Sequence, residues 1–347
     1  MSFNKIPLVD IGAMRGTDAA AKRRTADEVR EICHTVGFMY VTNHGVPETL
    51  IQRALGQAEA YFALPLEEKL KTDINKLGYH RGYVPMKTLA AQPGGKYDFQ
   101  EGFEVGFDFP KDHPAFLAGN KICAPNIWPA RPANFQKDVY DYFLAVLGLG
   151  HTLFRTFAHA FDLPEDWFED KLDNPIANLR LIYYPPHPVE VMADYGAGVG
   201  AHTDYECFTI LWQSEHGLEV RNPRGEWIAA PPVPGSFVIN IGDMMQRWTN
   251  DHFVSTPHRV TNRTGRARYS MPLFFSTNYD TIVRPLDRCV KAGDTPHYKP
   301  TKVGYWVEQN HAVAYAYRWP DRGKLPDPEI GPVPEVERTT ARAVSAR

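Results

Sequence analysis

The 347-residue sequence lacks the features that mark secreted, membrane-spanning and nucleic-acid-binding proteins. It has only four cysteines and no Cys-x-x-Cys pair, so a disulfide framework is not expected. No apolar run approaches the ~20 residues needed to cross a bilayer, and the N-terminus lacks the apolar segment of a signal peptide. The formal net charge of −3 provides no basic field to attract nucleic acid. We therefore expect a cytoplasmic protein with no nucleic-acid or membrane partner, and the sequence leaves the number of subunits open.

The first half of the chain predicts helices around a few short strands. Residues 6–11 indicate a strand, and Asp18 can cap a helix whose apolar residues recur every three or four positions. A second helix is expected after Pro47, and a long one over residues 132–161. Between them, residues 71–130 are rich in glycine, proline and aromatic residues without a sustained period, which predicts an irregular and functional segment.

The second half changes to short β-rich runs separated by turn residues. Such runs occur at 179–184, 208–213, 218–221, 237–241, 258–261 and 269–275. Several short strands with this punctuation favour a sandwich or closed barrel. We expect an α+β fold with a mainly β core. The expected regions are an N-terminal helical and irregular region at 1–130, a core with its supporting long helix at 131–320, and a tail at 321–347.

The segment around His202 and Asp204 carries the first chemical signal. In an extended strand, residues two apart point to the same face, so this imidazole and this carboxylate would lie side by side. Two histidines and one carboxylate on one face of an octahedron form the ligand set of non-haem Fe(II) oxygenases. One His-x-Asp is expected roughly once by chance in a chain of this size, and a histidine bonded to a nearby aspartate is the plainer alternative.

Two further groups strengthen the metal interpretation. His258 opens a later β run and is the candidate for the third ligand. Ten residues on, Arg268 and Ser270 again stand two apart and share a strand face. A guanidinium fork binds a carboxylate through two parallel hydrogen bonds, and a hydroxyl can add a third.

At this point the chain resembles the isopenicillin-N-synthase-like group of Fe(II)/2-oxoglutarate oxygenases. The resemblance covers nearly the whole length, and it is carried by an ordered set of segments: Ile6-Pro-Leu-Val-Asp, Asn43-His-Gly-Val, Tyr183-Tyr184-Pro-Pro, His202-Thr-Asp204, Gly242-Asp243, His258-Arg-Val and Arg268-Tyr-Ser270. Within the group, the stretch Arg247-Trp-Thr-Asn-Asp is most similar to fungal thymine hydroxylases, and bacterial ethylene-forming enzymes are also similar.

The resemblance implies a double-stranded β-helix (jelly roll) with N-terminal helices packed outside. It implies Fe(II) held by His202, Asp204 and His258, with no catalytic side chain beyond this metal centre. It implies Arg268 and Ser270 on the distal carboxylate of 2-oxoglutarate, with Tyr184 as a further contact. Its activity would be an O2-dependent dioxygenase that oxidises, most commonly hydroxylates, a small-molecule metabolite and releases succinate and CO2.

One departure from the family concerns the strand before Tyr184. Many plant members carry asparagine where this chain has Ile182, so that contact is lost or replaced. Arg180, on the same strand face, either compensates or contacts the substrate, as a matching arginine of thymine hydroxylases suggests.

The remaining predictions concern the substrate pocket. Tyr205, Trp248 and Phe274 are candidate substrate contacts beside Arg180, with plain core packing as the alternative for each. Two other functions stay open on the sequence alone: an iron-dependent oxidase of the same fold that does not use 2-oxoglutarate, and a non-enzymatic barrel that binds a small ligand.

Overall fold

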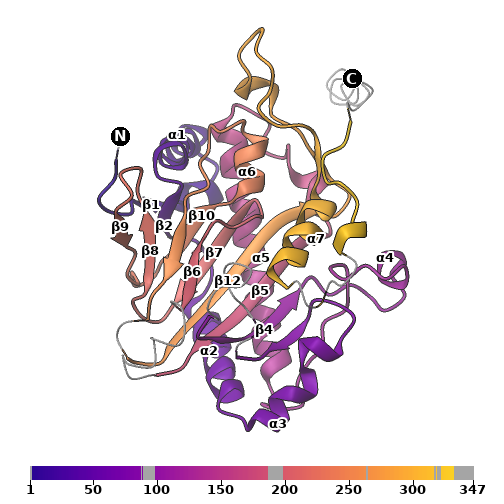
Figure 1. Cartoon of the computed structure of the whole chain (residues 1–347). Coiled ribbons are helices and arrows are strands. Elements are labelled where there is room, and N and C mark those ends of the chain that lie inside the picture. Colours follow the sequence, from indigo (N-terminus) through magenta and orange to yellow (C-terminus); the bar gives the residue numbers. More distant parts are fainter. Residues whose placement is uncertain are drawn as a thin grey trace.

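Two β-sheets form the centre of the computed structural model, which describes residues 2–86, 88, 98–186, 198–262, 265–315, 318 and 322–331 (Figure 1). The larger sheet has the strand order β1 (Leu8–Asp10), β2 (Phe38–Thr42), β10 (Phe237–Ile241), β7 (Phe208–Gln213), β12 (Arg268–Asn278), β5 (Pro175–Tyr184), β4 (Glu101–Gly106) and β3 (Gly82–Val84). The smaller sheet has the order β6 (Val199–His202), β11 (His258–Val260), β8 (Leu218–Arg221) and β9 (Trp227–Ala229).

The two sheets enclose a cavity, and their arrangement is the jelly roll that the sequence predicted. Side chains from the larger sheet, such as Tyr184 and Phe274, line this cavity together with Val199 and Val260 from the smaller sheet. The prediction of an α+β fold with a mainly β core is confirmed. A separate pair of short strands, β13 (Ile282–Val283) and β14 (Thr301–Lys302), lies outside both sheets.

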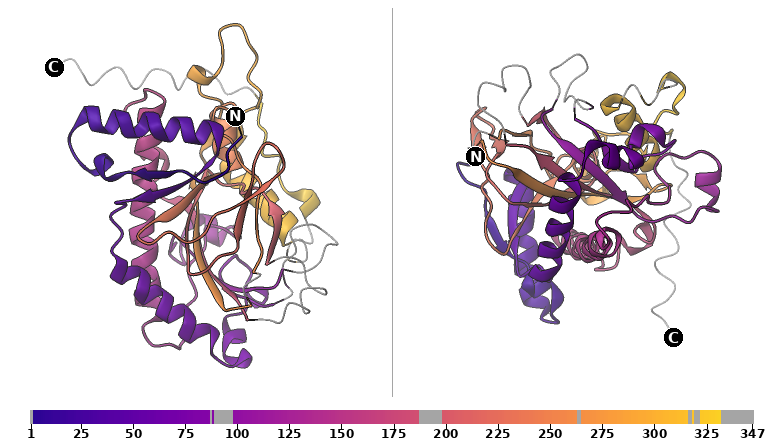
Figure 2. Two further views of the ribbon diagram at one scale, coloured as in Figure 1. Left: turned by 90° about the vertical axis from the view of Figure 1, so that its left-hand side faces the viewer. Right: turned by 90° about the horizontal axis from the view of Figure 1, so that it is seen from below.

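Helices α1 (Ala19–Thr35), α2 (Glu48–Phe62) and α5 (Phe135–Ala160) lie on the outer side of the larger sheet (Figure 2). The other helices are α3 (Leu66–Lys69), α4 (Pro114–Leu117), α6 (Asp243–Trp248) and α7 (Val303–Ala314), and α7 lies at the cavity. The long helix α5 packs on β12, where the Tyr142 hydroxyl lies 3.5 Å from the carbonyl oxygen of Met271. Helices α1 and α2 pack in turn on α5. Within the described residues, no helix has both the length and the apolar character that crossing a membrane requires.

The boundaries of α1 follow from its terminal residues, as the sequence predicted. The Asp18 carboxylate accepts hydrogen bonds from the backbone N–H groups of Ala20 and Ala21, which satisfies two of the unpaired donors of the first turn. At the other end Gly37 has a φ of +68°, and its N–H donates to the carbonyl of Ile32. A left-handed glycine here ends the helix and turns the chain directly into β2.

The segment from 71 to 130, predicted to be irregular, contains two strands of the larger sheet. β4 pairs with β5, and β3 pairs with β4 at the sheet edge. All six residues of β4 are buried, so both faces of the strand are covered. A strand buried on both faces shows no alternation of polar and apolar residues, which is why the two-residue period was missing from the sequence.

The predicted tail at 321–347 falls mostly outside the described residues, which end at 331. Its described part is bonded to the core. The backbone N–H of Lys302 donates to the carbonyl of Pro328, and Ile330 donates to the carbonyl of Pro300. Arg247 forms an ion pair with Glu329, with a distance of 3.0 Å between Nη2 and Oε1.

The contact between α5 and β12 yields a test of the packing. A Cβ atom added to the buried Gly150 would lie 2.1 Å from the Phe275 ring, whereas one added to the exposed Gly148 would meet nothing within 4 Å. We expect Gly150→Ala to lower the free energy of unfolding by ~1–3 kcal/mol through overpacking. The control Gly148→Ala should raise it by up to ~1 kcal/mol, because alanine favours the helix. Urea unfolding of both variants checks this, and equal effects would contradict the described packing.

Candidate functional site

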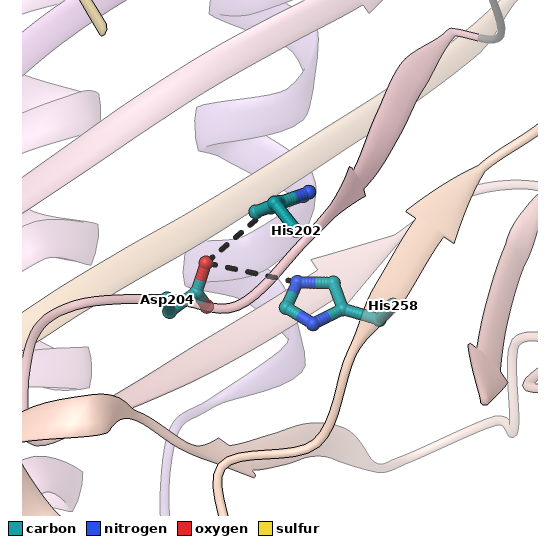
Figure 3. Close-up of side chains that lie close together, drawn as sticks. All are labelled: His202, Asp204 and His258. Carbon is teal, nitrogen blue, oxygen red and sulfur yellow. Dashed lines mark ion pairs between the residues drawn. The ribbon is translucent and has the colours of Figure 1, made fainter. Parts of the chain in front are cut away.

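Three side chains predicted as metal ligands converge inside the barrel (Figure 3). His202, Asp204 and His258 each offer one ligand atom, and these atoms lie within 4.8 Å of one another. The Asp204 Oδ1 atom is 3.5 Å from Nε2 of His202 and 3.6 Å from Nε2 of His258. Two imidazole nitrogens and one carboxylate oxygen suit Fe(II), a metal of intermediate hardness.

The strands bring the two histidines together by register. His258 of β11 stands directly opposite His202 of β6, and the two ring centroids are 4.3 Å apart. The pairing of His202 with Asp204 differs in detail from the prediction, because β6 ends at His202 and Asp204 lies in the segment that follows. Convergence therefore comes from the cross-strand pair and the loop rather than from one strand face.

The orientation of the Asp204 carboxylate is fixed by buried polar groups. The Thr209 hydroxyl and the Asn240 amide both donate to Oδ2, the latter at 2.7 Å. The backbone carbonyl of Asp204 accepts from the N–H of Asp243 at 2.8 Å. These bonds occupy Oδ2 and leave Oδ1 directed toward the two imidazoles.

The hydrogen bonds of the two imidazoles fix which nitrogen carries the proton. Nδ1 of His202 contacts the carbonyl of Gly200 at 2.8 Å, and Nδ1 of His258 contacts that of Thr256 at 3.2 Å. A carbonyl oxygen only accepts, so each Nδ1 is the donor. In the neutral rings Nε2 then presents a lone pair toward Asp204, which is the tautomer that binds a metal.

The ionisation of the three groups is also compatible with cation binding. Burial lowers the pKa of His258 to about 4, so this imidazole is neutral near pH 7. Burial opposes the charge on Asp204, but His258 and His202 hold its pKa below the ordinary value. Burial alone would lower the pKa of His202, yet the bond to Asp204 outweighs it and the pKa is raised. The cluster thus combines a carboxylate and a neutral imidazole with a second imidazole that readily holds positive charge.

Arg268 is fully buried in the same cavity, with 0% of its surface exposed. Its Nη2 donates to Oε1 of Gln213 at 2.9 Å, and its Nε donates to the carbonyl of Glu215. Among the described residues, Nη1 has no hydrogen-bond partner and no carboxylate lies at ion-pairing distance from the guanidinium. A buried cation that lacks an anion is costly unless a ligand supplies one.

The other two residues predicted for 2-oxoglutarate lie beside Arg268. Tyr184 stands opposite Arg268 in the pairing of β5 with β12, and the guanidinium carbon is 4.7 Å from the centre of the tyrosine ring. Ser270 pairs with Gln213 on one side and Ile182 on the other. Arg268, Ser270 and Tyr184 all line the cavity, so the residues predicted for the anchor are brought to one place.

The cavity has a volume of about 290 Å³, which suits small ligands. Of the predicted substrate contacts, Arg180, Tyr205 and Phe274 line it. Trp248 does not: its ring packs against Phe168 and lies in the aromatic core beneath α6. The prediction of a substrate role for Trp248 is corrected on this ground, because the apolar core, and not the cavity, buries its ring.

Arg180 occupies the side of the cavity formed by β4 and β5. Its Nε lies 3.2 Å from Oε1 of Glu104 in an ion pair without aligned hydrogen-bond geometry, and its Nη2 has no partner. Glu104 also accepts from the Asn178 amide at 2.6 Å and from the Tyr315 hydroxyl at 3.2 Å. The carboxylate is therefore well satisfied, whereas the arginine keeps an unused donor.

Several residues of the site were not predicted from the sequence. Thr209 and Asn240 orient Asp204, Gln213 orients Arg268, and α7 contributes His311 to the cavity wall. A signal existed for Thr209 and Asn240, since each is a polar residue inside an otherwise apolar strand run. A polar residue buried in such a run needs a partner, and that partner is often the functional group.

Glu206 is a further unpredicted residue of the cavity wall. Its side chain is 4% exposed, its Oε2 atom has no partner, and within the described residues no cation is at ion-pairing distance. Burial raises the pKa of Glu206 well above its ordinary value, with Asp204 as a further cause. No pattern in the sequence distinguished this glutamate from a surface residue.

Comparisons with known proteins agree with this geometry. Residues 175–277 match the model of the 2OG-Fe(II) oxygenase superfamily, and residues 6–131 match that of the non-haem dioxygenase in morphine synthesis N-terminal region. The 2-oxoglutarate-Fe(II) type oxidoreductase hxnY of Emericella nidulans is 37% identical over 321 residues, covering 90% of this chain and 92% of that protein. Homoarginine-6-hydroxylase of Oryza sativa subsp. japonica is 33% identical, covering 88% and 96%.

A solved structure gives the same result. Thymine hydroxylase of Neurospora crassa, in complex with alpha-ketoglutarate (2-oxoglutarate) and thymine, superposes with a TM-score of 0.79 at 27% identity, over 89% of this chain and 97% of that chain. Its fold and those of the curated relatives extend over nearly the whole length of this protein. The chain therefore belongs to the 2OG-Fe(II) oxygenase superfamily, and it is a 2-oxoglutarate-dependent Fe(II) dioxygenase.

Proposed function

We propose that His202, Asp204 and His258 hold Fe(II), and that Arg268 and Ser270 bind the distal carboxylate of 2-oxoglutarate with Tyr184 beside it. The observation that carries this proposal is the pairing, in one cavity, of a three-ligand cluster with a fully buried guanidinium that has no anionic partner among the described residues. The bound metal, 2-oxoglutarate and O2 supply the oxidising chemistry, in which one oxygen atom enters the substrate while succinate and CO2 are released.

Within this proposal the protein's own groups orient and desolvate the reactants. Gln213 and the Glu215 carbonyl hold the guanidinium in one orientation, so its free N–H groups are preorganised for a carboxylate. Thr209 and Asn240 do the same for Asp204. Asp204 and Arg268 are themselves buried, which strengthens each of these polar contacts.

We further propose that Arg180 contacts the substrate rather than 2-oxoglutarate. Arg180 and Tyr184 lie four residues apart on β5, a separation of roughly 13 Å along a strand. Arg268 stands opposite Tyr184, so a carboxylate bound there is out of reach of Arg180. Ile182 lies between them with an apolar side chain that cannot replace a polar contact.

The substrate of this chain is proposed to be a small, nitrogen-containing metabolite that is hydroxylated, contacted by Arg180, Tyr205 and Phe274. Two relatives support this class by their own ligands: one was solved with thymine, and another is named for homoarginine. Both molecules combine N–H donors with carbonyl or carboxylate acceptors. An oxidase that does not use 2-oxoglutarate, or a non-enzymatic barrel, would leave Arg268 buried without a counterion, so neither is favoured.

Metal binding tests the ligand assignment. We expect His202→Ala, Asp204→Ala and His258→Ala each to lower the affinity for Mn(II), used as a redox-quiet stand-in for Fe(II), by at least ~10-fold, because each removes a ligand. The exposed His216→Ala is the control and should bind as the wild type does. Calorimetric titration under anaerobic conditions measures all four, and wild-type affinity in any of the three ligand variants would refute its assignment.

Binding of 2-oxoglutarate tests the anchor. We expect Arg268→Met to weaken 2-oxoglutarate binding to the Mn(II)-loaded protein by at least ~30-fold, about 2 kcal/mol, since it removes the cation that the proposal places at the distal carboxylate. Arg266→Met is a matched control two residues away, where an exposed arginine pairs with Glu215. Unchanged affinity in Arg268→Met would mean that the carboxylate binds elsewhere.

The same titration separates the roles of the two cavity arginines. We expect Arg180→Lys and Arg180→Met to keep 2-oxoglutarate affinity within ~3-fold of the wild type, because the side chain at position 180 does not reach the distal carboxylate. The lysine variant keeps a cation beside Glu104 and guards against misfolding. A loss in both variants as large as that in Arg268→Met would reassign Arg180 to the cosubstrate.

A further inference from the structure

Unpartnered polar atoms gather at one end of the central cavity, away from Arg268. A smaller pocket, with a volume of about 10 Å³, adjoins the cavity there. Glu206, Asn178 and His311 line both spaces, so they lie at the junction between them. Each has a buried atom without a hydrogen-bond partner among the residues that the structure describes: Oε2 of Glu206, Oδ1 of Asn178 and Nδ1 of His311. Buried polar atoms are rarely left unpaired, so three at one junction indicate a ligand group that is to be bound there.

The chemical character of one of these atoms is fixed by its neighbours. The Asn178 amide donates from Nδ2 to the Glu104 carboxylate at 2.6 Å. A carboxylate accepts, so the amide orientation is determined and Oδ1 is the atom that faces the junction as an acceptor. Reversing the amide would place two oxygens against each other. A partner of Asn178 Oδ1 must therefore donate a hydrogen.

Glu206 brings a carboxyl group to the same place, and in either protonation state one of its oxygens accepts a hydrogen bond. Its carboxyl is 4% exposed, and within the described residues neither a lysine nor an arginine lies at ion-pairing distance. Two cations lie on this side. Arg180 is paired with Glu104, and Arg81, which lines the smaller pocket, donates to the carbonyls of His80 and Ile122 while its Nε has no partner among the described residues. The unused donors of Arg180, by contrast, require an acceptor. The cavity thus presents acceptors at the junction and a donor on the wall formed by β5.

From this arrangement we propose that Glu206 and Asn178 bind an N–H group of the prime substrate, and that Glu206 is a specificity-determining residue. The substrate class that fits is a small amide, lactam, amino acid or guanidine, which carries an N–H donor for Glu206 and Asn178 and an acceptor for Arg180. This inference rests on the proposed function, because it assigns the substrate side of the same cavity. The inference goes beyond the proposed function because it assigns a role to Glu206 and requires a hydrogen-bond donor on the substrate.

A bound water is the competing occupant of the junction. The smaller pocket is at the lower limit of the ~10–15 Å³ that one water needs. A water there would satisfy the same three atoms without any contact to the substrate. The two occupants predict different results. If Glu206 contacts the substrate, ligand affinity depends both on Glu206 and on the ligand's N–H group, whereas a bound water leaves ligand affinity independent of both.

The test compares matched ligands on matched variants. The Mn(II)- and 2-oxoglutarate-loaded protein is titrated by calorimetry with small amides, lactams, amino acids and guanidines, including thymine, 2-pyridone and L-homoarginine. Each heterocycle is paired with its N-methylated counterpart, such as 1,3-dimethylthymine or N-methyl-2-pyridone. The variants are Glu206→Gln, which keeps one oxygen acceptor, and Glu206→Met, which keeps the length of the side chain. Glu308→Met is the control, because Glu308 is also buried but is bonded to Asn120 away from the cavity.

We expect ligands with an N–H donor to bind the wild type at least 10-fold more tightly than their N-methylated counterparts. The affinity for the N–H ligands should fall at least 10-fold in Glu206→Met, fall less in Glu206→Gln, and stay unchanged in Glu308→Met. The preference for the N–H ligand should disappear in Glu206→Met. Affinities for Mn(II) and 2-oxoglutarate should stay at wild-type values in Glu206→Met, which shows that the centre is intact and separates this test from that of the proposed function.

Three results would overturn the inference. The first is equal binding of N–H and N-methylated ligands by the wild type, and the second is unchanged affinity of N–H ligands in Glu206→Met, as a bound water predicts. The third is that the wild type binds none of the N–H compounds, because a cavity with these free acceptors must then serve another ligand. If Glu206→Met fails to fold, Glu206→Gln decides the question, because N–H ligands should still bind it more weakly than the wild type, and unchanged affinity would overturn the inference.

Discussion

The buried carboxylate of Asp204 is the group on which the rest of the centre depends. Two side chains from the larger sheet, Thr209 and Asn240, satisfy one of its oxygens, and the other faces the lone pairs of two imidazoles. Three acceptor atoms within 4.8 Å repel one another unless a proton or a cation lies between them. Burial opposes a charge on His202, but the bond to Asp204 outweighs it and raises the pKa of His202, so the cluster favours positive charge at its centre. A divalent ion bound at this place would be attracted by all three atoms, as the proposed ligand set requires.

The need of buried charged groups for a partner also explains the rest of the cavity. Arg268 is a buried cation held by neutral acceptors, so its charge remains available to an anion. Arg180 is largely neutralised by Glu104, so it offers hydrogen bonds rather than net charge. The cavity therefore has a cationic end, a metal-binding centre and a junction of acceptors, and each end selects a different ligand chemistry. Stability gained elsewhere in the fold, through the packing of α5 on the larger sheet, offsets the cost of leaving these groups unpaired.

Sequence reasoning grouped the three candidate ligands, which do lie together, although a cross-strand pair and a loop bring them there and not one strand face. Arg268 and Ser270 were predicted to share a face from spacing alone, and both line the cavity. The jelly roll followed from the run of short strands and the family resemblance. What the sequence did not yield depended on contacts between distant segments. β4 showed no alternation because both its faces are buried, and Trp248 was assigned to the pocket although its ring lies in the core. Glu206 could be recognised only once its lack of a partner was visible.

The central claim is that one cavity holds a metal at the His202, Asp204 and His258 cluster and an anion at Arg268. An anaerobic crystal structure of the protein with Mn(II) and 2-oxoglutarate tests both halves at once. The account predicts the metal bonded to Nε2 of each histidine and to Oδ1 of Asp204, with the distal carboxylate of 2-oxoglutarate hydrogen-bonded to Nη1 of Arg268. A metal bound by other residues, or a carboxylate paired with Arg180 while Nη1 of Arg268 stays unbonded, would contradict it.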